Sequence, residues 1–284
     1  MSALPPSEVE PLPLADLDTA DGLKGCCAAV YEHPAVRWLL GEELHPGGEA
    51  ATLRALELGG VRTEDRLLDV ASGRGASALL AARELACEVT GLEYSGAAVR
   101  EANRAAAATG LDDRVRFRQG DAEALPFADA SFDAVLCECS LCTFPDKRRA
   151  ASELHRVLRP GGRLVLSDVV VDRRRLPEEL TGPLAVLACV GEALSRDGYE
   201  RLLGDAGLPV LAVEERNEDA ARLARRVHER LRGARLLGFE GMAGAPLATG
   251  DAIDLLARAR RAIGDGALGY AIFIASRSMP PRPT

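Results

Sequence analysis

The amino-acid sequence predicts a doubly wound α/β fold built on a mostly parallel sheet. From Arg66 onward, short runs of strand-like composition alternate with longer runs of helical composition. This alternation is typical of right-handed βαβ units, in which a helix connects each strand to the next parallel one. The first strand leads into the small-residue turn Ala71 to Gly75 and then a helix. A length of 284 residues with 47% hydrophobic content is enough for one large core with additions.

The individual elements follow at short spacing. A helical stretch is expected from Asp21 to Leu58, before the alternating region. Strands are expected at Arg66–Val70, Glu88–Glu93, Val115–Gln119, Phe132–Cys137 and Arg163–Val170, and helices at Ala76–Ala86, Gly96–Thr109 and Lys147–Leu158. Pro160 and the two glycines after it end the last of these helices, because proline cannot continue a helix and glycine permits a left-handed turn. The remainder predicts helices at Glu178–Leu194, Arg196–Ala206, Asp219–Leu236 and Asp251–Ile263, and strands at Val210–Arg216 and Gly269–Ser276.

Bulk composition narrows the class of partner. The formal net charge of -8 argues against a nonspecific nucleic-acid or membrane binder, because affinity for phosphate depends on clustered Lys and Arg. No apolar run approaches the roughly 20 residues that span a bilayer, and the N-terminus is Pro-rich and acidic. We therefore expect a cytoplasmic protein with a small substrate. Its seven cysteines are expected to be thiols and not a disulfide framework.

Three positions after successive strands suggest a nucleotide-like ligand. The glycine-containing turn after Arg66–Val70 lets the backbone approach a ligand and points N–H groups at it, although an ordinary tight turn has the same composition. Glu93 ends the second strand, where an acid can bind both ribose hydroxyls. Asp121 follows the third strand and can accept from an adenine amine. The alternatives are a solvated strand-end acid for Glu93 and a turn-stabilising role for Asp121.

The motifs in combination resemble the class I methyltransferases. The matching stretches are Leu68 to Gly75, Gly91 to Glu93, Gly120 to Phe127, Ser131 to Val135 and Leu158 to Leu164. The resemblance implies a seven-stranded sheet whose last strand is antiparallel, and S-adenosylmethionine as methyl donor. It implies that the donor is bound by Asp69, Ala71, Gly73, Gly75, Glu93, Tyr94, Asp121, Ala122 and Cys137. Ala71 stands where many members have glycine.

Cysteines after the fourth strand suggest the acceptor. Side chains two apart on a strand share a face, so Cys137 and Cys139 are expected to point together and Glu138 away from them. Glu138-Cys139 with Pro145-Asp146-Lys147, the segment at Cys189, and Lys24 followed by Cys26-Cys27 resemble motifs of the arsenite methyltransferases, which have Asn where this chain has Glu138.

This second resemblance implies specific ligands. Cys139 and Cys189 are the implied thiolate ligands of trivalent arsenic, with Cys26 or Cys27 as a mobile third. It further implies a disulfide-forming step that an external thiol reductant such as glutathione or thioredoxin resets. Thiolate is the soft ligand that suits a soft metalloid, and in-line attack by the arsenic lone pair depends on positioning more than on a base.

The expected organisation has four parts. Residues 1–20 form a flexible tail, residues 21–58 the helical segment with the cysteine pair, residues 59–176 the S-adenosylmethionine-binding core, and residues 177–284 the acceptor-side helices and final strands. The oligomeric state is left open.

Several alternatives stay open at this point. The cysteines are also compatible with buried hydrophobic packing, and Cys137, Cys139 and Cys142 with a zinc site. His33 and His45 are candidate proton acceptors if the acceptor is an organic hydroxyl or amine. The competing functions are a methyltransferase that acts on an organic O, N or C acceptor and a noncatalytic binder of a soft metal. Tyr31 is expected to serve only as packing for the N-terminal helix.

Overall fold

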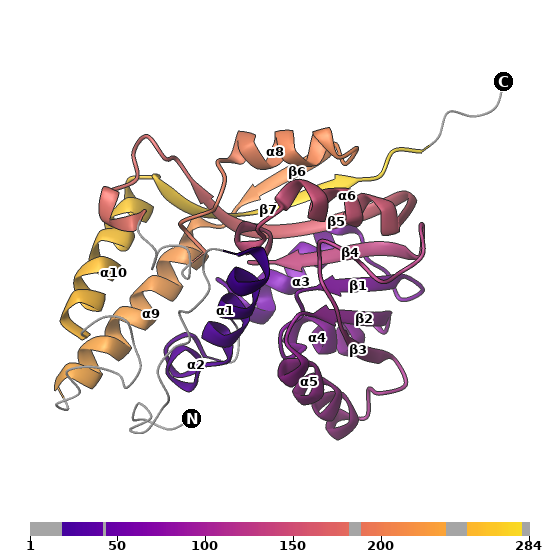
Figure 1. Ribbon diagram of the computed structural model, residues 1–284, viewed down its shortest axis with the longest axis horizontal. Helices are drawn as coiled ribbons and strands as arrows, with labels where there is room; N and C mark the ends of the chain where they lie inside the picture. The colour runs from indigo at the N-terminus through magenta and orange to yellow at the C-terminus, as the bar shows by residue number, and fades with distance from the viewer. Residues whose placement is uncertain (1–18, 42–43, 182–188, 237–248, 280–284) are drawn as a thin grey trace.

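A seven-stranded sheet organises the chain. The computed structural model describes residues 19–41, 44–181, 189–236 and 249–279. The strands are β1 (Arg66–Val70), β2 (Glu88–Glu93), β3 (Val115–Gln119), β4 (Phe132–Glu138), β5 (Leu158–Val171), β6 (Val210–Glu215) and β7 (Leu268–Ser276), in the order β3-β2-β1-β4-β5-β7-β6 (Figure 1). The pairs from β3 to β5 are parallel, and β7 runs antiparallel to β5 and β6. The predicted doubly wound, seven-stranded sheet with an antiparallel last strand is confirmed.

The helices cover both faces of this sheet. They are α1 (Ala20–Glu32), α2 (Pro34–Leu40), α3 (Gly48–Gly59), α4 (Ala76–Leu85), α5 (Gly96–Thr109), α6 (Lys147–Val157), α8 (Arg196–Asp205), α9 (Asn217–Leu236) and α10 (Thr249–Gly264), with short 3-10 turns η1 (Leu141–Thr143) and η2 (Glu178–Leu180). Figure 1 shows α6 and α8 on one side of the sheet and α3, α4 and α5 on the other. Chain order reverses between β1 and β4, and ligands of such sheets bind at this switch point.

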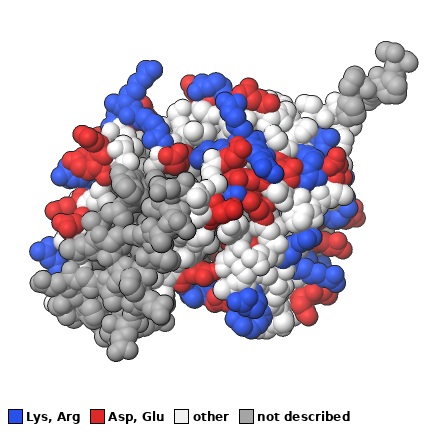
Figure 2. All heavy atoms as spheres, in the orientation of Figure 1, with Lys and Arg blue, Asp and Glu red and all other residues white. Residues whose placement is uncertain are grey.

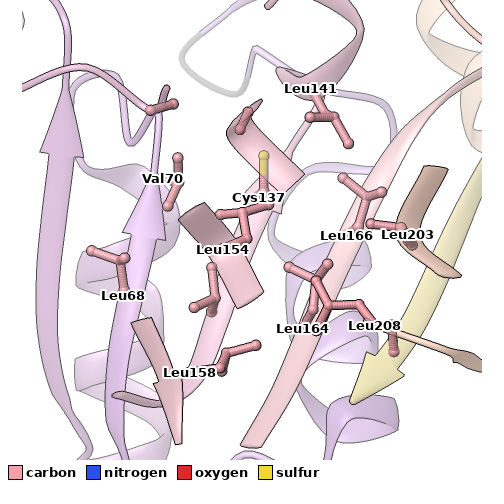
Figure 3. Close-up of a cluster of buried hydrophobic side chains, with 14 of the residues drawn as sticks. Leu68, Val70, Cys137, Leu141, Leu154, Leu158, Leu164, Leu166, Leu203 and Leu208 are labelled. Carbon is pink, nitrogen blue, oxygen red and sulfur yellow. The ribbon is translucent and has the colours of Figure 1, made fainter. Parts of the chain in front are cut away.

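Each face has its own apolar core. On one face, Leu154 and Leu203 of the covering helices pack against Leu68 and Leu164 of the sheet, and Cys137 lies among them (Figure 3). On the other face, alanines of α4 and α5 pack against Leu67, Leu136 and Val165 of the sheet. Small alanine side chains let α4 and α5 approach the sheet closely. With helices packed on both faces, the central strands are shielded from water.

One predicted helix is wrong over part of its length. The segment Glu178–Leu194 begins with the single turn η2, residues 182–188 lie outside the described residues, and Cys189 to Leu194 are not helical. Leu194 instead forms a parallel bridge with Val170 and accepts a hydrogen bond from Val171 N at 3.0 Å. Pairing with the end of β5 therefore replaces helix formation there. The expected tail at 1–20 falls almost entirely outside the described residues.

The surface charges, the length of the apolar helices and the cysteines can be compared with what the composition predicted. On the face shown in Figure 2, basic and acidic side chains of the described residues are interspersed. Within the described ranges, no helix combines the length and apolarity needed to cross a bilayer. All seven cysteines are described and are free thiols, as the sequence predicted.

We expect Gly91→Ala to destabilise the fold. A Cβ at Gly91 in β2 would overlap the ring of Phe117 in β3, so the ring or the strand must shift. The free energy of unfolding should fall by about 1–3 kcal/mol, measured by urea titration. Adding Phe117→Leu should recover part of that loss, because the smaller side chain makes room.

The control is Gly233→Ala in α9, where an added Cβ meets no atom within 4 Å. This change should stabilise by roughly 0.5–1 kcal/mol, because alanine favours a helix over glycine. Equal stability of the Gly91→Ala variant and the wild type would contradict the packing argument.

Candidate functional site

A pocket opens at the carboxyl ends of the four strands β3, β2, β1 and β4. Its wall consists of the loops that follow these strands, one face of α1, and the residues Leu44 and His45 before α3. The sequence predicted that cofactor and acceptor residues meet at this edge. Of the predicted cofactor residues, Asp69, Ala71, Gly73, Glu93, Tyr94, Asp121 and Ala122 line the pocket, as do Cys27 and Cys139.

The turn after β1 is bound by hydrogen bonds to a carboxylate of the next strand, β2. Ala71 and Gly73 have φ of 58° and 53°, in the left-handed region. The N–H of Gly73 donates to Glu93 Oε2 at 2.9 Å, and Ser95 N donates to Glu93 Oε1 at 2.9 Å. Glu93 thus joins two loops, and the solvated-acid alternative is wrong, since only 9% of the residue is exposed. Burial raises the pKa of Glu93, while these N–H donors lower it.

Gly75 has a packing role that the sequence did not reveal. It has φ of 87° and does not line the pocket. A Cβ at this position would overlap the ring of Phe117 and crowd Ala102. The glycine therefore lets α4 begin close to β3 and α5, whereas the loop of Ala71 to Gly73 lines the pocket.

Asp121 stabilises its own turn and binds a lysine. Its Oδ1 accepts from Glu123 N at 2.9 Å, which is the turn-stabilising role. Its Oδ2 accepts from Lys24 Nζ at 2.8 Å, and Lys24 also donates to Glu123 Oε2 at 2.5 Å. Lys24 lies on α1, so this helix is fixed across the adenine end of the proposed cofactor site. The contact joins residues 97 positions apart, which no local pattern reveals.

The centre of the pocket contains buried oxygen atoms without a partner. Asp69 Oδ2 and Ser72 Oγ have no hydrogen-bond partner among the described residues. Burial, with Glu138 and Glu93 nearby, raises the pKa of Asp69 well above its ordinary range. Buried polar atoms are normally satisfied, so these two point to a ligand that carries donors and positive charge. S-adenosylmethionine, a cation with an ammonium group, fits this requirement.

Thiols from distant segments meet beside the pocket. Cys189 Sγ lies 2.8 Å from the hydroxyl of Tyr31, and donates to Cys139 O at 3.6 Å in the protonated form. Cys139 and Cys189 have φ of 50° and 61°, which is costly for residues other than glycine and is often found at functional sites. Hydrogen bonds from Cys139, Cys142 and Tyr31 lower the pKa of Cys189 well below 9.0. Tyr31 thus does more than pack, contrary to the expectation.

The other cysteines differ in their surroundings. Cys27 lines the pocket, and its pKa is raised to about 11 by burial and by negative charge at Cys189 and Cys26. Cys26 is buried and does not line the pocket. Cys137 is buried in the core of Figure 3 and does not line the pocket. Cys139 lies beyond the end of β4, so strand alternation does not relate the two side chains. The expectation that they point together is wrong.

The zinc alternative is not supported by this arrangement. Cys137 packs in one apolar cluster, and Cys139 and Cys142 pack in another. Across the described ranges, no group of three or more His, Cys, Asp or Glu side chains is arranged to hold a metal ion. The thiols of Cys139, Cys142 and Cys189 therefore form a hydrogen-bonded cluster and not a preformed coordination site.

Glu138 lies at the centre of a polar network that the sequence did not predict. Its carboxylate accepts from Thr52 Oγ1 at 3.0 Å and from Ser77 Oγ at 2.6 Å. His45 Nε2 lies 3.7 Å from Glu138 Oε2, and both residues line the pocket. His33, the other candidate proton acceptor, is the N-cap of α2 and does not line the pocket. The presence of Glu138, where the arsenite methyltransferases have Asn, was the one feature of the sequence that pointed to this network.

Comparisons with known proteins find similarity to methyltransferases. A methyltransferase-domain family model matches residues 68–166. The chain is 33% identical over 260 residues to a 27-O-demethylrifamycin SV methyltransferase of Amycolatopsis mediterranei, covering 84% of this chain and 91% of that one. It is 32% identical over 162 residues to an arsenite methyltransferase of Halobacterium salinarum, covering 54% of this chain and 40% of that one.

Solved structures extend the similarity over the whole fold. The [4+2]-cyclase SpnF superposes with a TM-score of 0.73 at 25% identity, covering 96% of this chain and all of that one. A geranyl diphosphate methyltransferase in complex with S-adenosylmethionine superposes with a TM-score of 0.66 at 23% identity, covering 95% and 96% of the two chains. The sheet order, the pocket at its carboxyl edge and these relatives lead to one conclusion: the chain belongs to the class I S-adenosylmethionine-dependent methyltransferases.

Proposed function

We propose that the protein methylates a soft trivalent metalloid, arsenite or a close relative, held by the thiolates of Cys139 and Cys189. The observation that carries this proposal is the meeting of thiols from separate segments at the edge of the methyl-donor pocket. Cys139 follows β4, Cys189 precedes the bridge to β5, and Cys27 lies on α1. Thiolate is the soft ligand that suits such an acceptor.

Each residue has a defined role in this proposal. Cys189 supplies the first thiolate, because three donors favour its charged form. Cys139 lines the pocket and presents the acceptor to the donor. Cys27, and not Cys26, is the third ligand. Cys27 lines the pocket, and negative charge at Cys189 helps to raise its pKa, so the two thiols are near one another. Since the described thiols do not form a ready three-coordinate site, metalloid binding must draw Cys27 inward.

The chemistry needs positioning more than proton transfer. S-adenosylmethionine supplies an electrophilic methyl group on a sulfonium centre. The residues after β4 hold the acceptor so that its lone pair lies in line with that methyl group, and such orientation lowers the barrier substantially. The lone pair forms the new bond to carbon while the carbon–sulfur bond breaks. The acceptor is thereby oxidised by two electrons, and an external thiol reductant such as glutathione or thioredoxin restores the trivalent state by forming a disulfide.

An organic hydroxyl is the competing acceptor. The relative from Amycolatopsis mediterranei, which aligns over most of both chains, is named as a methyltransferase of an O-demethylated rifamycin. Under this alternative the cysteines are only buried packing. The two functions differ in whether turnover needs Cys139 and Cys189.

Removal of either thiolate ligand should abolish arsenite methylation. With labelled S-adenosylmethionine, glutathione and arsenite, Cys139→Ser and Cys189→Ser should each lose activity by about 100-fold or more, because a hydroxyl is a poor ligand for a soft centre. The matched control is Cys87→Ser, a buried cysteine in the core on the α4 side of the sheet. It should stay within about threefold of wild type.

Full activity in either thiolate variant would overturn the proposal. Methylation of an organic hydroxyl by both variants at the wild-type rate, with no arsenite turnover by the wild type, would favour the competing acceptor instead.

The thiolate of Cys189 should persist to unusually low pH. Its pKa lies well below 9.0, so the charged form is present above that lowered pKa and is lost as pH falls through it. A titration followed by thiolate absorbance near 240 nm should show a step below pH 9 that disappears in Cys189→Ser. Tyr31→Phe should move this step to higher pH, because it removes one of the donors. A wild-type profile identical to that of Cys189→Ser would contradict the assignment.

A further inference from the structure

One face of helix α1 lines the methyl-donor pocket. Lys24, Cys27, Ala28 and Tyr31 recur at helical spacing, and all four line the pocket. The loops that follow β1, β2 and β3 line the same pocket from the sheet. A methyl donor held by these loops therefore lies between the edge of the sheet and α1.

Polar contacts join the N-terminal helices to the loops after β1 and β2. Glu32 of α1 accepts a hydrogen bond from Ser95 Oγ, in the loop after β2. Arg37 of α2 lies 3.7 Å from the carboxylate of Glu101 in α5, and the same carboxylate pairs with Arg74 in the turn after β1. Both contacts thus cross from α1 and α2 to loops that line the pocket.

Lys24 adds a third contact, to the turn after β3. Its ammonium group lies 2.8 Å from Asp121 Oδ2 and 2.5 Å from Glu123 Oε2. Only 11% of the Lys24 side chain and 8% of the Glu123 side chain are exposed, so salt screens this pair weakly. Glu123 is itself held in place, because its Oε1 accepts from Asp146 N at 2.7 Å. Lys24 therefore fastens α1 to a fixed point on the sheet side of the pocket.

The chain has a break between α1 and α2 at which α1 can turn. Helix α2 begins at Pro34, which has no N–H to continue the hydrogen bonding of α1, and His33 between the helices has an extended backbone. The far end of α2 is held by α9, where Arg230 donates to the carbonyls of Trp38 and Leu39 at 2.7 Å each. Helix α2 is thus anchored, whereas α1 is joined to it only through the break.

We propose that α1 is a lid on the methyl-donor pocket and that the ion pairs of Lys24 are its latch. When these pairs break, α1 turns at the break between the helices and opens the pocket. When they form again, α1 encloses the donor. Opening of the lid then sets the rates at which the donor enters and S-adenosylhomocysteine leaves. The lid covers the donor, so its action does not depend on which acceptor is methylated.

Removal of the latch should accelerate entry and exit together. Surface plasmon resonance of S-adenosylhomocysteine on the immobilised full chain gives both rate constants. Lys24→Met should raise the association and dissociation rate constants by about fivefold or more each and leave Kd within about twofold, because the latch closes the free and the bound protein alike. The matched control is Arg196→Met, which removes the cation of an exposed ion pair with Glu200 on α8. It should leave both rate constants within about twofold of wild type.

A second variant tests the partner of Lys24. Glu123→Gln keeps an oxygen that can accept from Asp146 N but removes the negative charge. It should accelerate both rates by a smaller factor than Lys24→Met, because Asp121 still binds the lysine. Combining Glu123→Gln with Lys24→Met should add no further acceleration, because Glu123 then has no cation to bind.

Three results would overturn the proposal. Unchanged rate constants in both single variants would show that Lys24 does not hold a lid closed. Faster dissociation with unchanged association would make Lys24 a direct contact of the cofactor. Factors that multiply in the double variant would show that Lys24 and Glu123 act separately. Because no acceptor is present in these measurements, their outcome is independent of whether arsenite is methylated.

Discussion

The structure depends on one buried carboxylate, that of Glu93. Through Gly73 N and Ser95 N it joins the loop after β1 to the loop after β2. Both loops then keep their N–H groups occupied and their open sides toward the pocket. Together with the hydrogen bond from Ser72 N to Leu92 O at 3.0 Å, this pair of bonds holds the left-handed backbone at Ala71 and Gly73. The pairing of β1 with β2 thus places these two loops side by side at the pocket.

Negative charge at this edge of the sheet explains why a cationic cofactor suits it. Asp69 and Glu138 are almost fully buried, and water cannot compensate them. S-adenosylmethionine, the methyl donor of this family, is a sulfonium with an ammonium group and so carries positive charge. The same edge also places Lys24 between Asp121 and Glu123, so α1 is held by ion pairs at this end of the pocket.

Helix α1 connects the two functional ends of the pocket. Lys24 contacts Asp121, whereas Tyr31, two turns along the helix, contacts Cys189. Cys27 lies between them and lines the pocket. Any movement of α1 that accompanies cofactor binding would therefore reposition the third thiol of the proposed acceptor site.

The sequence by itself determined the sheet, its turns and the acids at strand ends. These depend on local signals: hydrophobic runs, glycines at left-handed positions, Glu93 at the end of one strand and Asp121 shortly after another. It failed where strand alternation stops, at Cys137 and Cys139, and where pairing with β5 overrode helix propensity before Leu194. Only the tertiary structure decided which distant side chains meet. Tyr31 and Cys189 are 158 positions apart, and Thr52 and Glu138 are 86 apart. Such contacts depend on how helices dock on the sheet, and no local spacing encodes that.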